Sequence, residues 1–427
     1  MSRLKVVRGM KDILPVEAPR WHHVEDNARR VFEAYGYQEM RTPVLEHTEL
    51  FRRSIGEATD IVEKEMYTFD DRKGRSLSMR PEATASCVRA SVENGLARGG
   101  DGLRVWYAGP MFRYEKMQKE RYRQFYQLGA EVYGLEGAAA DAEIILVTAR
   151  LWRTLGLANV SLELNSLGTR EEQAAYRAQL REYLQDRSDA LDDDSRRRLQ
   201  TNPLRVLDSK NPQLQELIDA APTPLDSLGE ASRAHFDEVV ATLHACGVAL
   251  RTNPRLVRGL DYYTRTVFEW VSGDLGAQSA ICGGGRYDRL FAEIGGPDTP
   301  AVGFSAGIER IVAVMQAGGV AVAAAAPQLY LAAVGEAPCR GAHALAERLR
   351  DELPDVRMVV DAAGGGFRPK LKRADRSGAL LALLLGDDEL AAGNIQIKTL
   401  RGETQEQVAL GDAAARIRTL LRPGAPV

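Results

Sequence analysis

The stretch from Phe112 to Glu131 carries side chains whose types and spacing could do chemistry. We interpret it as two strands joined by a charged loop. Because side chains alternate along a strand, Arg113 and Glu115 would share one face of the first strand. One face of the second strand would hold Phe125, Gln127, Gly129 and Glu131. Buried polar groups need partners, so such a face could bind a small polar ligand. A solvated hairpin with a charged turn is the alternative.

Two details of this hairpin favour a ligand that carries phosphate. Glycine has no side chain, so Gly129 would leave a gap between Gln127 and Glu131 where a small molecule could sit. The loop between the strands is basic, and lysine and arginine bind phosphate oxygens well. The four cations of the loop are Lys116, Lys119, Arg121 and Arg123.

Two further arginines stand where an anion could bind. Arg258 precedes a glycine and the segment Asp261-Tyr262-Tyr263, so a ligand could approach its guanidinium closely. Arg310 would lie early in a helix, where the positive end of the helix dipole adds to its charge. From spacing alone, a surface arginine remains the alternative at both positions. The run Gly283–Gly285 fits neither the P-loop nor the dinucleotide pattern, and a flexible turn also explains it.

The elements that must position these residues belong to a long, nearly neutral chain. It has 427 residues, a net charge of -3 and 44% hydrophobic content. That length predicts two or three domains, and the charge balance excludes a generally basic nucleic-acid coat. The four cysteines form no CxxC pair, which argues against a zinc site or disulfides and favours a reducing cytoplasm. No apolar run is long enough to span a membrane.

The periodicity of the sequence predicts helices and strands in a definite order. We expect a catalytic domain over residues 1–320 with a charge-dense helical insertion over about 169–248, a linker over 321–327 and an α/β domain over 328–427. The expected helices are Val16–Tyr35, Pro81–Glu93, Asp141–Leu155, Cys339–Leu349, Pro369–Ser377 and Asp412–Leu421. The expected strands outside the hairpin are Ser76–Met79, Val160–Leu164, Leu250–Thr252, Tyr262–Val271, Leu329–Val334, Arg357–Asp361, Leu380–Leu385 and Ile395–Leu400.

Five separated segments resemble motifs of one known family. The hairpin, with FRYE before the basic loop and RQFYQLGAE after it, resembles motif 2 of class II aminoacyl-tRNA synthetases in the form found in histidyl-tRNA synthetases. The extended segment Tyr37–Glu46 resembles motif 1, and Ala301–Arg310 resembles motif 3. The segments RGLDYY from Arg258 and GGGRYD from Gly283 are similar to the histidine-specific signatures of that family.

This resemblance implies an α+β class II catalytic core, an antiparallel sheet flanked by helices, with a helical insertion and a C-terminal α/β anticodon-binding domain. It also implies a histidine–tRNA ligase, which activates L-histidine with ATP and magnesium and transfers it to the 3′ end of tRNA(His). The products would be AMP and pyrophosphate. A homodimer formed through the motif 1 region, in the cytoplasm and without a membrane, is the implied assembly.

By the same resemblance, individual residues acquire roles. Arg113 and Arg258 would be catalytic. The histidine-binding residues would be Glu82, Ala83, Thr84, Arg113, Gln127, Glu131, Arg258, Tyr262, Tyr263 and Tyr287. The ATP-binding residues would be Arg113, Glu115, Arg121, Phe125 and Arg310. The tRNA-binding residues would be Lys116, Gln118, Lys119, Arg123, Arg368, Lys370, Lys372 and Arg373. Arg376 would extend the basic patch of the C-terminal domain.

The sequence departs from the family pattern at a few positions. Ala83 stands where glycine is expected, Lys116-Met117 replaces Arg-Pro, Glu120 replaces glycine, and Tyr126 stands where histidine is common. Two other functions stay open beside the ligase. One is the synthetase-like regulatory subunit of the first enzyme of histidine biosynthesis, which typically lacks the anticodon domain and the catalytic arginines. The other is an RNA-binding module without catalysis.

Overall fold

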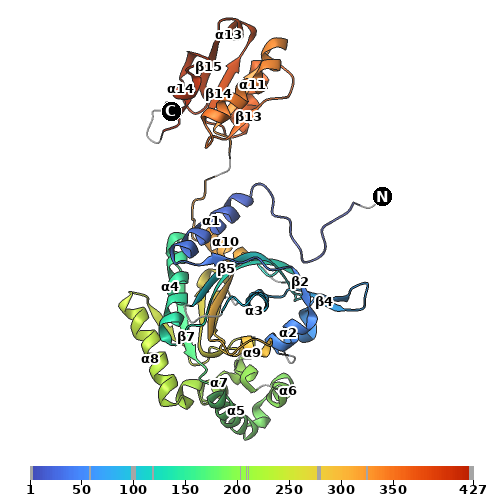
Figure 1. The fold of residues 1–427 in the computed structure, drawn as a ribbon, viewed down its shortest axis with the longest axis vertical. Coiled ribbons are helices and arrows are strands. Elements are labelled where there is room, and N and C mark those ends of the chain that lie inside the picture. The colour runs from blue at the N-terminus through green and yellow to red at the C-terminus, as the bar shows by residue number, and fades with distance from the viewer. Residues whose placement is uncertain are drawn as a thin grey trace. The chain divides into compact units, whose positions relative to one another are not determined.

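The computed structural model of the chain divides into two compact units, Met1–Val322 and Ala323–Val427. Figure 1 shows both, with the N-terminal unit in blue to yellow and the C-terminal unit in orange to red. The structure describes residues 3–56, 59–97, 102–117, 120–201, 203–207, 209, 211–276, 280–323 and 326–422. Within these residues no helix is both long and apolar enough to cross a membrane.

An eight-stranded sheet forms the centre of the first unit, in the order β1-β5-β6-β11-β10-β9-β7-β8. The inner pairs are antiparallel, and the two edge pairs, β1 with β5 and β7 with β8, are parallel. The strands are β1 Gln38–Glu39, β5 Leu103–Phe112, β6 Gln124–Tyr133, β7 Val160–Ser166, β8 Leu250–Thr252, β9 Thr264–Ser272, β10 Ala280–Arg286 and β11 Ala301–Gly307. This arrangement confirms the predicted, mainly antiparallel core.

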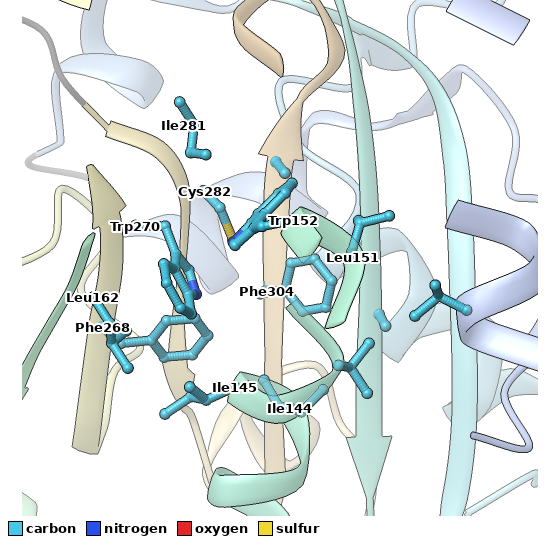
Figure 2. Close-up of a cluster of buried hydrophobic side chains, with 14 of the residues drawn as sticks. Ile144, Ile145, Leu151, Trp152, Leu162, Phe268, Trp270, Ile281, Cys282 and Phe304 are labelled. Atoms are coloured by element: carbon cyan, nitrogen blue, oxygen red, sulfur yellow. The ribbon is translucent and has the colours of Figure 1, made fainter. Parts of the chain in front are cut away.

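Helices cover one face of this sheet because each presents an apolar stripe to it. They are α1 Ala18–Ala34, α4 Ala138–Thr154, α8 Glu230–Ala245 and α10 Ile308–Ala317. On α4, Ile144, Ile145 and Leu151 recur at helical spacing and are fully buried. Figure 2 shows them against aromatic side chains from the strands, including Phe268, Trp270 and Phe304. This core fixes the strands that carry the site.

A smaller layer with its own sheet packs on the other elements of the first unit. Its strands are β2 Leu45–His47, β3 Thr68–Asp70 and β4 Ser76–Met79, in the order β2-β4-β3. Its helices are α2 Thr48–Ile55, α3 Thr84–Glu93, the short α9 Leu290–Glu293 and one π-helical turn, Ile61–Glu65. The helix predicted from Pro81 begins later, at Thr84, because the carboxylate of Glu82 accepts hydrogen bonds from the backbone N–H groups of Thr84 and Ala85 and so caps the helix there.

The charge-dense segment after β7 is helical. It contains α5 Arg170–Gln185, α6 Asp193–Thr201 and α7 Gln215–Asp219, with short 3-10 turns between them. These helices bury their own cluster, which includes Tyr176, Leu180 and Leu214. The last helix, α8, instead packs on α4 and buries Phe236 in the main core. The separately packed part of this segment therefore ends before α8.

The C-terminal unit contains a five-stranded mixed sheet between helices. The strand order is β13-β12-β14-β15-β16, parallel among the first three and antiparallel after β14. The strands are β12 Leu329–Ala333, β13 Met358–Val360, β14 Leu381–Leu385, β15 Asn394–Thr399 and β16 Gln405–Ala409, and the helices are α11 Glu336–Glu352, α12 Phe367–Arg376, α13 Asp387–Ala391 and α14 Ala413–Leu420. The α/β pattern was predicted, whereas β16 and α13 were not.

Candidate active site

A cavity of about 660 Å³ lies over the middle of the eight-stranded sheet. The predicted site residues that line it are Glu82, Thr84, Arg113, Glu115, Arg121, Phe125, Gln127, Arg258, Tyr262, Tyr263 and Arg310. Ala83, Glu131 and Tyr287 are almost completely buried. The helical segment after β7 also contributes to the wall, through Gln173 and Arg177. Residues far apart in the sequence thus meet at one place.

The hairpin places its charged residues differently from the prediction. Strand β5 ends at Phe112, so Arg113 and Glu115 lie in the connecting segment and not on a strand face. Arg113 is held there by a hydrogen bond of 2.8 Å from its Nε to the carbonyl oxygen of Pro81. Its guanidinium carbon lies 5.3 Å from the ring centroid of Phe125. The loop therefore brings Arg113 against the ring that was predicted to stack on adenine.

The predicted gap over Gly129 is filled. A Cβ atom built on Gly129 would lie 2.5 Å from the hydroxyl oxygen of Tyr107, which belongs to the paired residue on β5. The glycine therefore makes room for a protein ring and not for a ligand. The prediction failed because cross-strand packing cannot be read from one strand alone.

Glu131 lies on β6 with no exposed surface. Its Oε1 accepts a hydrogen bond of 2.8 Å from the Thr84 hydroxyl, and its Oε2 accepts one from the Tyr287 hydroxyl. Burial raises the pKa of Glu131 to about 8, against the opposing effect of the two hydroxyl hydrogen bonds. No ion pair to Glu131 occurs within the described residues. The carboxyl group is thus hydrogen-bonded but has no cation beside it.

Sequence reasoning assigned no specific role to Gly303 on β11, which makes room for this carboxylate. Gly303 pairs with Glu131 across the sheet, and a Cβ atom on Gly303 would lie 1.5 Å from Glu131 Oε2. The register that places Gly303 opposite Glu131 depends on strands far apart in the sequence.

Ala83, which departs from the family pattern, is tolerated by the backbone. Its φ is -112° and its ψ is -17°, so this position does not need the conformational freedom of glycine. The following hydrogen bonds from Thr84 and Ala85 to Glu82 are intact, at 2.7 and 3.0 Å. The loop at the start of α3 therefore keeps a regular geometry despite the substitution.

Arg258 is held by Glu269, which the sequence did not single out, and lies against the glycine run. Its Nη1 donates to Glu269 on β9, and its guanidinium lies over Gly283, where a Cβ atom would come within 2.5 Å of it. Its Nε is buried and has no hydrogen-bond partner within the described residues. The glycine-rich stretch is thus a central strand, β10, and not a flexible turn: it lets the arginine lie flat over the sheet.

Three tyrosines form an aromatic corner beside these groups. The ring centroids of Tyr262 and Tyr263 are 4.6 Å apart, and that of Tyr287 lies 5.3 Å from Tyr262. All three rings are buried. Their hydroxyl groups provide donors on rigid supports, since an aromatic side chain has few rotatable bonds. Gln127, also buried, offers a side-chain oxygen without a partner in the described part of the chain.

Two further predicted ATP-binding arginines of the cavity have partners within the protein. Arg121 lies 2.9 Å from Glu115, and Arg310 donates to the carbonyl oxygen of Ala280. Arg123 lies with its guanidinium carbon 3.5 Å from the ring centroid of Tyr114, so it stacks on that ring. Lys116 is exposed, whereas Gln118 and Lys119 lie outside the described residues. Two cations of the basic loop, Arg121 and Arg123, therefore already contact other side chains of the same hairpin.

The basic patch of the C-terminal unit is smaller than predicted. Lys370 is buried and donates to the carbonyl oxygens of Asp361 and Ala363, at 3.2 and 2.7 Å. Arg373 pairs with the carboxylate of Asp361 at 2.9 Å. Lys370 therefore does not belong to the surface, since the face of α12 that carries it packs on the sheet. Arg368, Lys372 and Arg376 are exposed.

Comparisons with known proteins agree with these motifs. A family model described as histidyl-tRNA synthetase matches residues 9–311, and one described as an anticodon binding domain matches residues 328–420. The chain is 56% identical to a histidine–tRNA ligase of Alkalilimnicola ehrlichii over 97% of this chain and 96% of that protein. It is 55% identical to a histidine–tRNA ligase of Halorhodospira halophila over 98% of both.

A solved structure gives the same result for the fold. The apo histidyl-tRNA synthetase of S. aureus superposes with a TM-score of 0.82 at 31% identity, over 97% of this chain and all of that one. The match includes the C-terminal unit. The chain belongs to the histidyl-tRNA synthetase family of class II aminoacyl-tRNA synthetases.

Proposed function

We propose that this chain joins L-histidine to the 3′ end of tRNA(His) in two steps at the cavity over the sheet. The observation that carries the proposal is the composition of that cavity. Arg113, Arg258 and Arg310 line it, as phosphate chemistry requires, and so does Thr84, which is bonded to the buried carboxyl group of Glu131. An oxyanion site and an amino acid pocket therefore share one space.

The histidine pocket would be built on Glu131. Imidazole carries N–H groups, and a carboxylate without a cation of its own is a suitable acceptor for them. Tyr263 would hold the other ring nitrogen, and the unpartnered oxygen of Gln127 would accept from the α-ammonium group. A site whose polar groups stay unpaired with the wrong substrate rejects it strongly, by about 10⁴-fold or more.

In the first step a carboxylate oxygen of histidine attacks the α-phosphorus of ATP. The bond from that phosphorus to the bridging oxygen of pyrophosphate breaks, and histidyl-adenylate remains. Negative charge grows on the α-phosphate oxygens, where Arg113 and Arg258 would stabilise it because fixed donors need no reorganisation. The hydrogen bond of Arg113 to Pro81 and the ion pair of Arg258 with Glu269 fix the directions of both guanidinium groups.

In the second step a terminal ribose hydroxyl of the tRNA attacks the carbonyl carbon of the adenylate. The bond between that carbon and the phosphate oxygen breaks, and AMP leaves. Phe125 and Glu115 would bind adenine in both steps, by stacking and by accepting from its amino group. Arg121 and Arg310 would hold the outer phosphates.

Magnesium would be bound through the phosphates of ATP and not by a site made of protein ligands alone. Within the described residues no group of three or more histidine, cysteine or carboxylate side chains could hold a metal ion. Magnesium is commonly bound through substrate phosphates and one or two carboxylates, so this donor set fits a phosphate-borne ion. When bound, it would neutralise charge on the phosphates.

The C-terminal unit, over about 328–427, would bind the anticodon end of the tRNA, and residues 1–320 would carry catalysis. Arg368 and Lys372 on α12 are the exposed candidates for RNA contact, together with Lys116 and Arg123 in the hairpin loop for the acceptor end. Phosphate contacts of this kind set register and affinity. Arg373 could join them only by leaving Asp361.

We also propose a homodimer in the cytoplasm. Strand β2 overlaps the end of the motif 1 segment, and the small sheet that it forms with β4 and β3 exposes Leu45 and Phe69 by 43% and 46%. Large apolar side chains on a sheet are suited to a protein interface. All four cysteines are free, which suits a reducing compartment.

The test is histidine-dependent ATP–pyrophosphate exchange on the purified chain, with the other amino acids as controls. Exchange with histidine alone is expected. Absence of exchange while histidine still binds would favour the regulatory relative.

Arg258→Ala tests the proposed catalytic role of Arg258. Adenylation should fall at least about 10²-fold, because a positioned charge donor for the transition state is lost, while circular dichroism shows a folded protein. Arg150→Ala removes an arginine from the surface of α4 and should leave exchange unchanged. Near-normal exchange in Arg258→Ala would remove the proposed catalytic role.

A further inference from the structure

The end of β11 leaves a backbone donor of the active-site strand in need of a partner. Strands β11 and β6 pair residue by residue from Ala301 opposite Tyr133 to Gly307 opposite Gln127. The chain then leaves the sheet and begins α10 at Ile308. Tyr126, the next residue of β6, therefore lies beyond the last paired residue of β11. A buried N–H without a partner is costly, so something must bind it.

The side chain of Glu309 fills this place. Its Oε1 and Oε2 lie 3.0 and 3.1 Å from the backbone nitrogen of Tyr126, so both carboxylate oxygens accept from one N–H group. Glu309 is the second residue of α10, where the helix dipole favours a negative charge. It is partly buried, and it is separated from Tyr126 by 183 positions in the sequence. One carboxylate thus continues the β11 side of the sheet by one residue.

The residues next to this contact are those proposed to bind ATP. Phe125 and Gln127 flank Tyr126 and line the cavity, whereas the ring of Tyr126 packs edge-on against Trp21 of α1, with 5.2 Å between the centroids. On the other chain segment, Arg310 follows Glu309 directly, and both line the same cavity. The contact therefore joins the strand that carries the adenine ring partner to the helix that carries a phosphate-binding arginine.

We propose that Glu309 is a positioning residue for ATP, which holds Phe125 and Arg310 at a fixed separation through the backbone of Tyr126. The proposal rests on the proposed function, since it assumes that Phe125 and Arg310 contact ATP. We do not expect Glu309 to position the residues that bind histidine. Gln127 and Glu131 lie in the part of β6 that β11 pairs directly, so the histidine side of the pocket has support that does not depend on Glu309.

This difference makes the proposal testable by separate Michaelis constants. In the full-length chain, Glu309→Ala should raise the KM for ATP in pyrophosphate exchange at least about tenfold, because the hydrogen bond that joins the helix to the strand is lost. The KM for histidine should stay within about threefold. Glu309→Gln keeps an oxygen that can accept from Tyr126 and should stay close to the unchanged protein in both constants.

Two further variants separate positioning from the charge at the helix start. Glu309→Asp keeps the negative charge near the dipole but is one methylene shorter, so it should also raise the KM for ATP. Glu230→Ala removes an exposed acid from the first turn of α8 and should change neither constant. If Glu309→Asp behaves like the unchanged protein, charge alone matters and the proposal is overturned.

An equal rise of both Michaelis constants in Glu309→Ala, or a lower melting temperature with unchanged constants, would also overturn it. Should Glu309→Ala not fold, the comparison of Glu309→Asp with Glu309→Gln decides the question. Failure of the proposed function is recognised separately, because the unchanged protein would then show no histidine-dependent exchange at all.

Discussion

Asp141 and Glu131 are two carboxyl groups of the same unit that are both fully buried, yet their surroundings are opposite. Asp141, on α4, has a cation and two other donors around it. Glu131, on β6, has two hydroxyl groups and no ion pair within the described residues. The first site is complete in the ligand-free protein. The carboxyl group of the second site could still interact with a positively charged ligand or with one that carries N–H groups.

The network around Asp141 is built from four elements. Arg286 Nε on β10 donates to Oδ1 at 2.8 Å, and the Thr266 hydroxyl on β9 donates to Oδ2 at 2.5 Å. His235 Nε2 on α8 lies 2.7 Å from Oδ2. Burial alone would raise the pKa of Asp141, but the hydrogen bond of His235 and the charge of Arg286 outweigh it and lower that pKa. Asp141 is thus held ionised in the core.

The contrast separates a buried charge used for structure from one kept for a substrate. Arg286 pairs with Asp141, and the next residue, Tyr287, donates a hydrogen bond to Glu131. The network around Asp141 is therefore connected through the backbone to the partner of Glu131. A rigid support of this kind keeps a binding group in position before the ligand arrives. We therefore expect matched amide substitutions at the two carboxyl groups to have different consequences.

Asp141→Asn should have the larger effect on stability. It removes the fully buried anion of Arg286 and leaves that guanidinium with its ion pair to Asp288, and removal of one partner from a buried ion pair costs about 3–5 kcal/mol. The free energy of unfolding from urea denaturation should fall by that amount. A loss below about 1 kcal/mol would show that Asp288 is a sufficient partner for Arg286, and the contrast between the two acids would then fail.

Glu131→Gln should instead act on binding. Hydrogen bonds to charged groups contribute about 1.5–3 kcal/mol, so the Kd for histidine should rise roughly 10- to 150-fold. The KM for ATP should change less than threefold, because Phe125 and the arginines stay in place. Stability at neutral pH should be almost unchanged, since the carboxyl group has no buried cation to abandon.

Isothermal calorimetry gives the Kd of Glu131→Gln for histidine, and pyrophosphate exchange at varied ATP concentration gives its KM for ATP. An unchanged affinity for histidine would remove Glu131 from the pocket and leave it as a structural acid.

The sequence was informative where a side chain and its neighbours along the chain decide the chemistry. Arg113, Arg258 and Glu131 were identified because each stands in a short motif of unusual composition, and the structure brings them to one cavity or just behind it. The C-terminal α/β domain followed from the alternation of predicted strands and helices, which a single sequence displays directly. The antiparallel sheet of the first unit was instead implied by the family resemblance.

The rest depends on which strands and helices meet. Gly303 makes room for the side chain of Glu131 because the two residues are paired across strands β11 and β6. Glu269 holds Arg258 because the two side chains form an ion pair. Glu309 was passed over in favour of the arginine beside it. Lys370 was assigned to a basic surface because the helix is rich in cations, yet the face that carries it turns inward to Asp361. None of these relations leaves a pattern along the chain itself.

The pH dependence of stability should also distinguish Glu131 from Asp141. The expected change in the free energy of unfolding per pH unit is smaller than the loss expected for Asp141→Asn. The pKa of Glu131 is raised from 4.5 to about 8 in the folded protein, so between these values the folded state holds a proton that the unfolded state has released. Stability should therefore fall as pH rises from about 4.5 to about 8, by at most about 1.4 kcal/mol per pH unit from this group. Asp141 acts in the opposite sense, because its lowered pKa means that its contribution is lost only as pH falls through that pKa.

Urea denaturation of the ligand-free protein at several pH values checks this, with Glu131→Gln as the reference. The amide cannot titrate, so the fall in stability from pH 5 to pH 8 should be clearly shallower in Glu131→Gln than in the unchanged protein. Asp141→Asn should keep the fall, because it leaves Glu131 as it is. Parallel curves for the unchanged protein and Glu131→Gln would show that Glu131 is already ionised at neutral pH, and thus that its two hydroxyl partners stabilise the charge without help from a ligand.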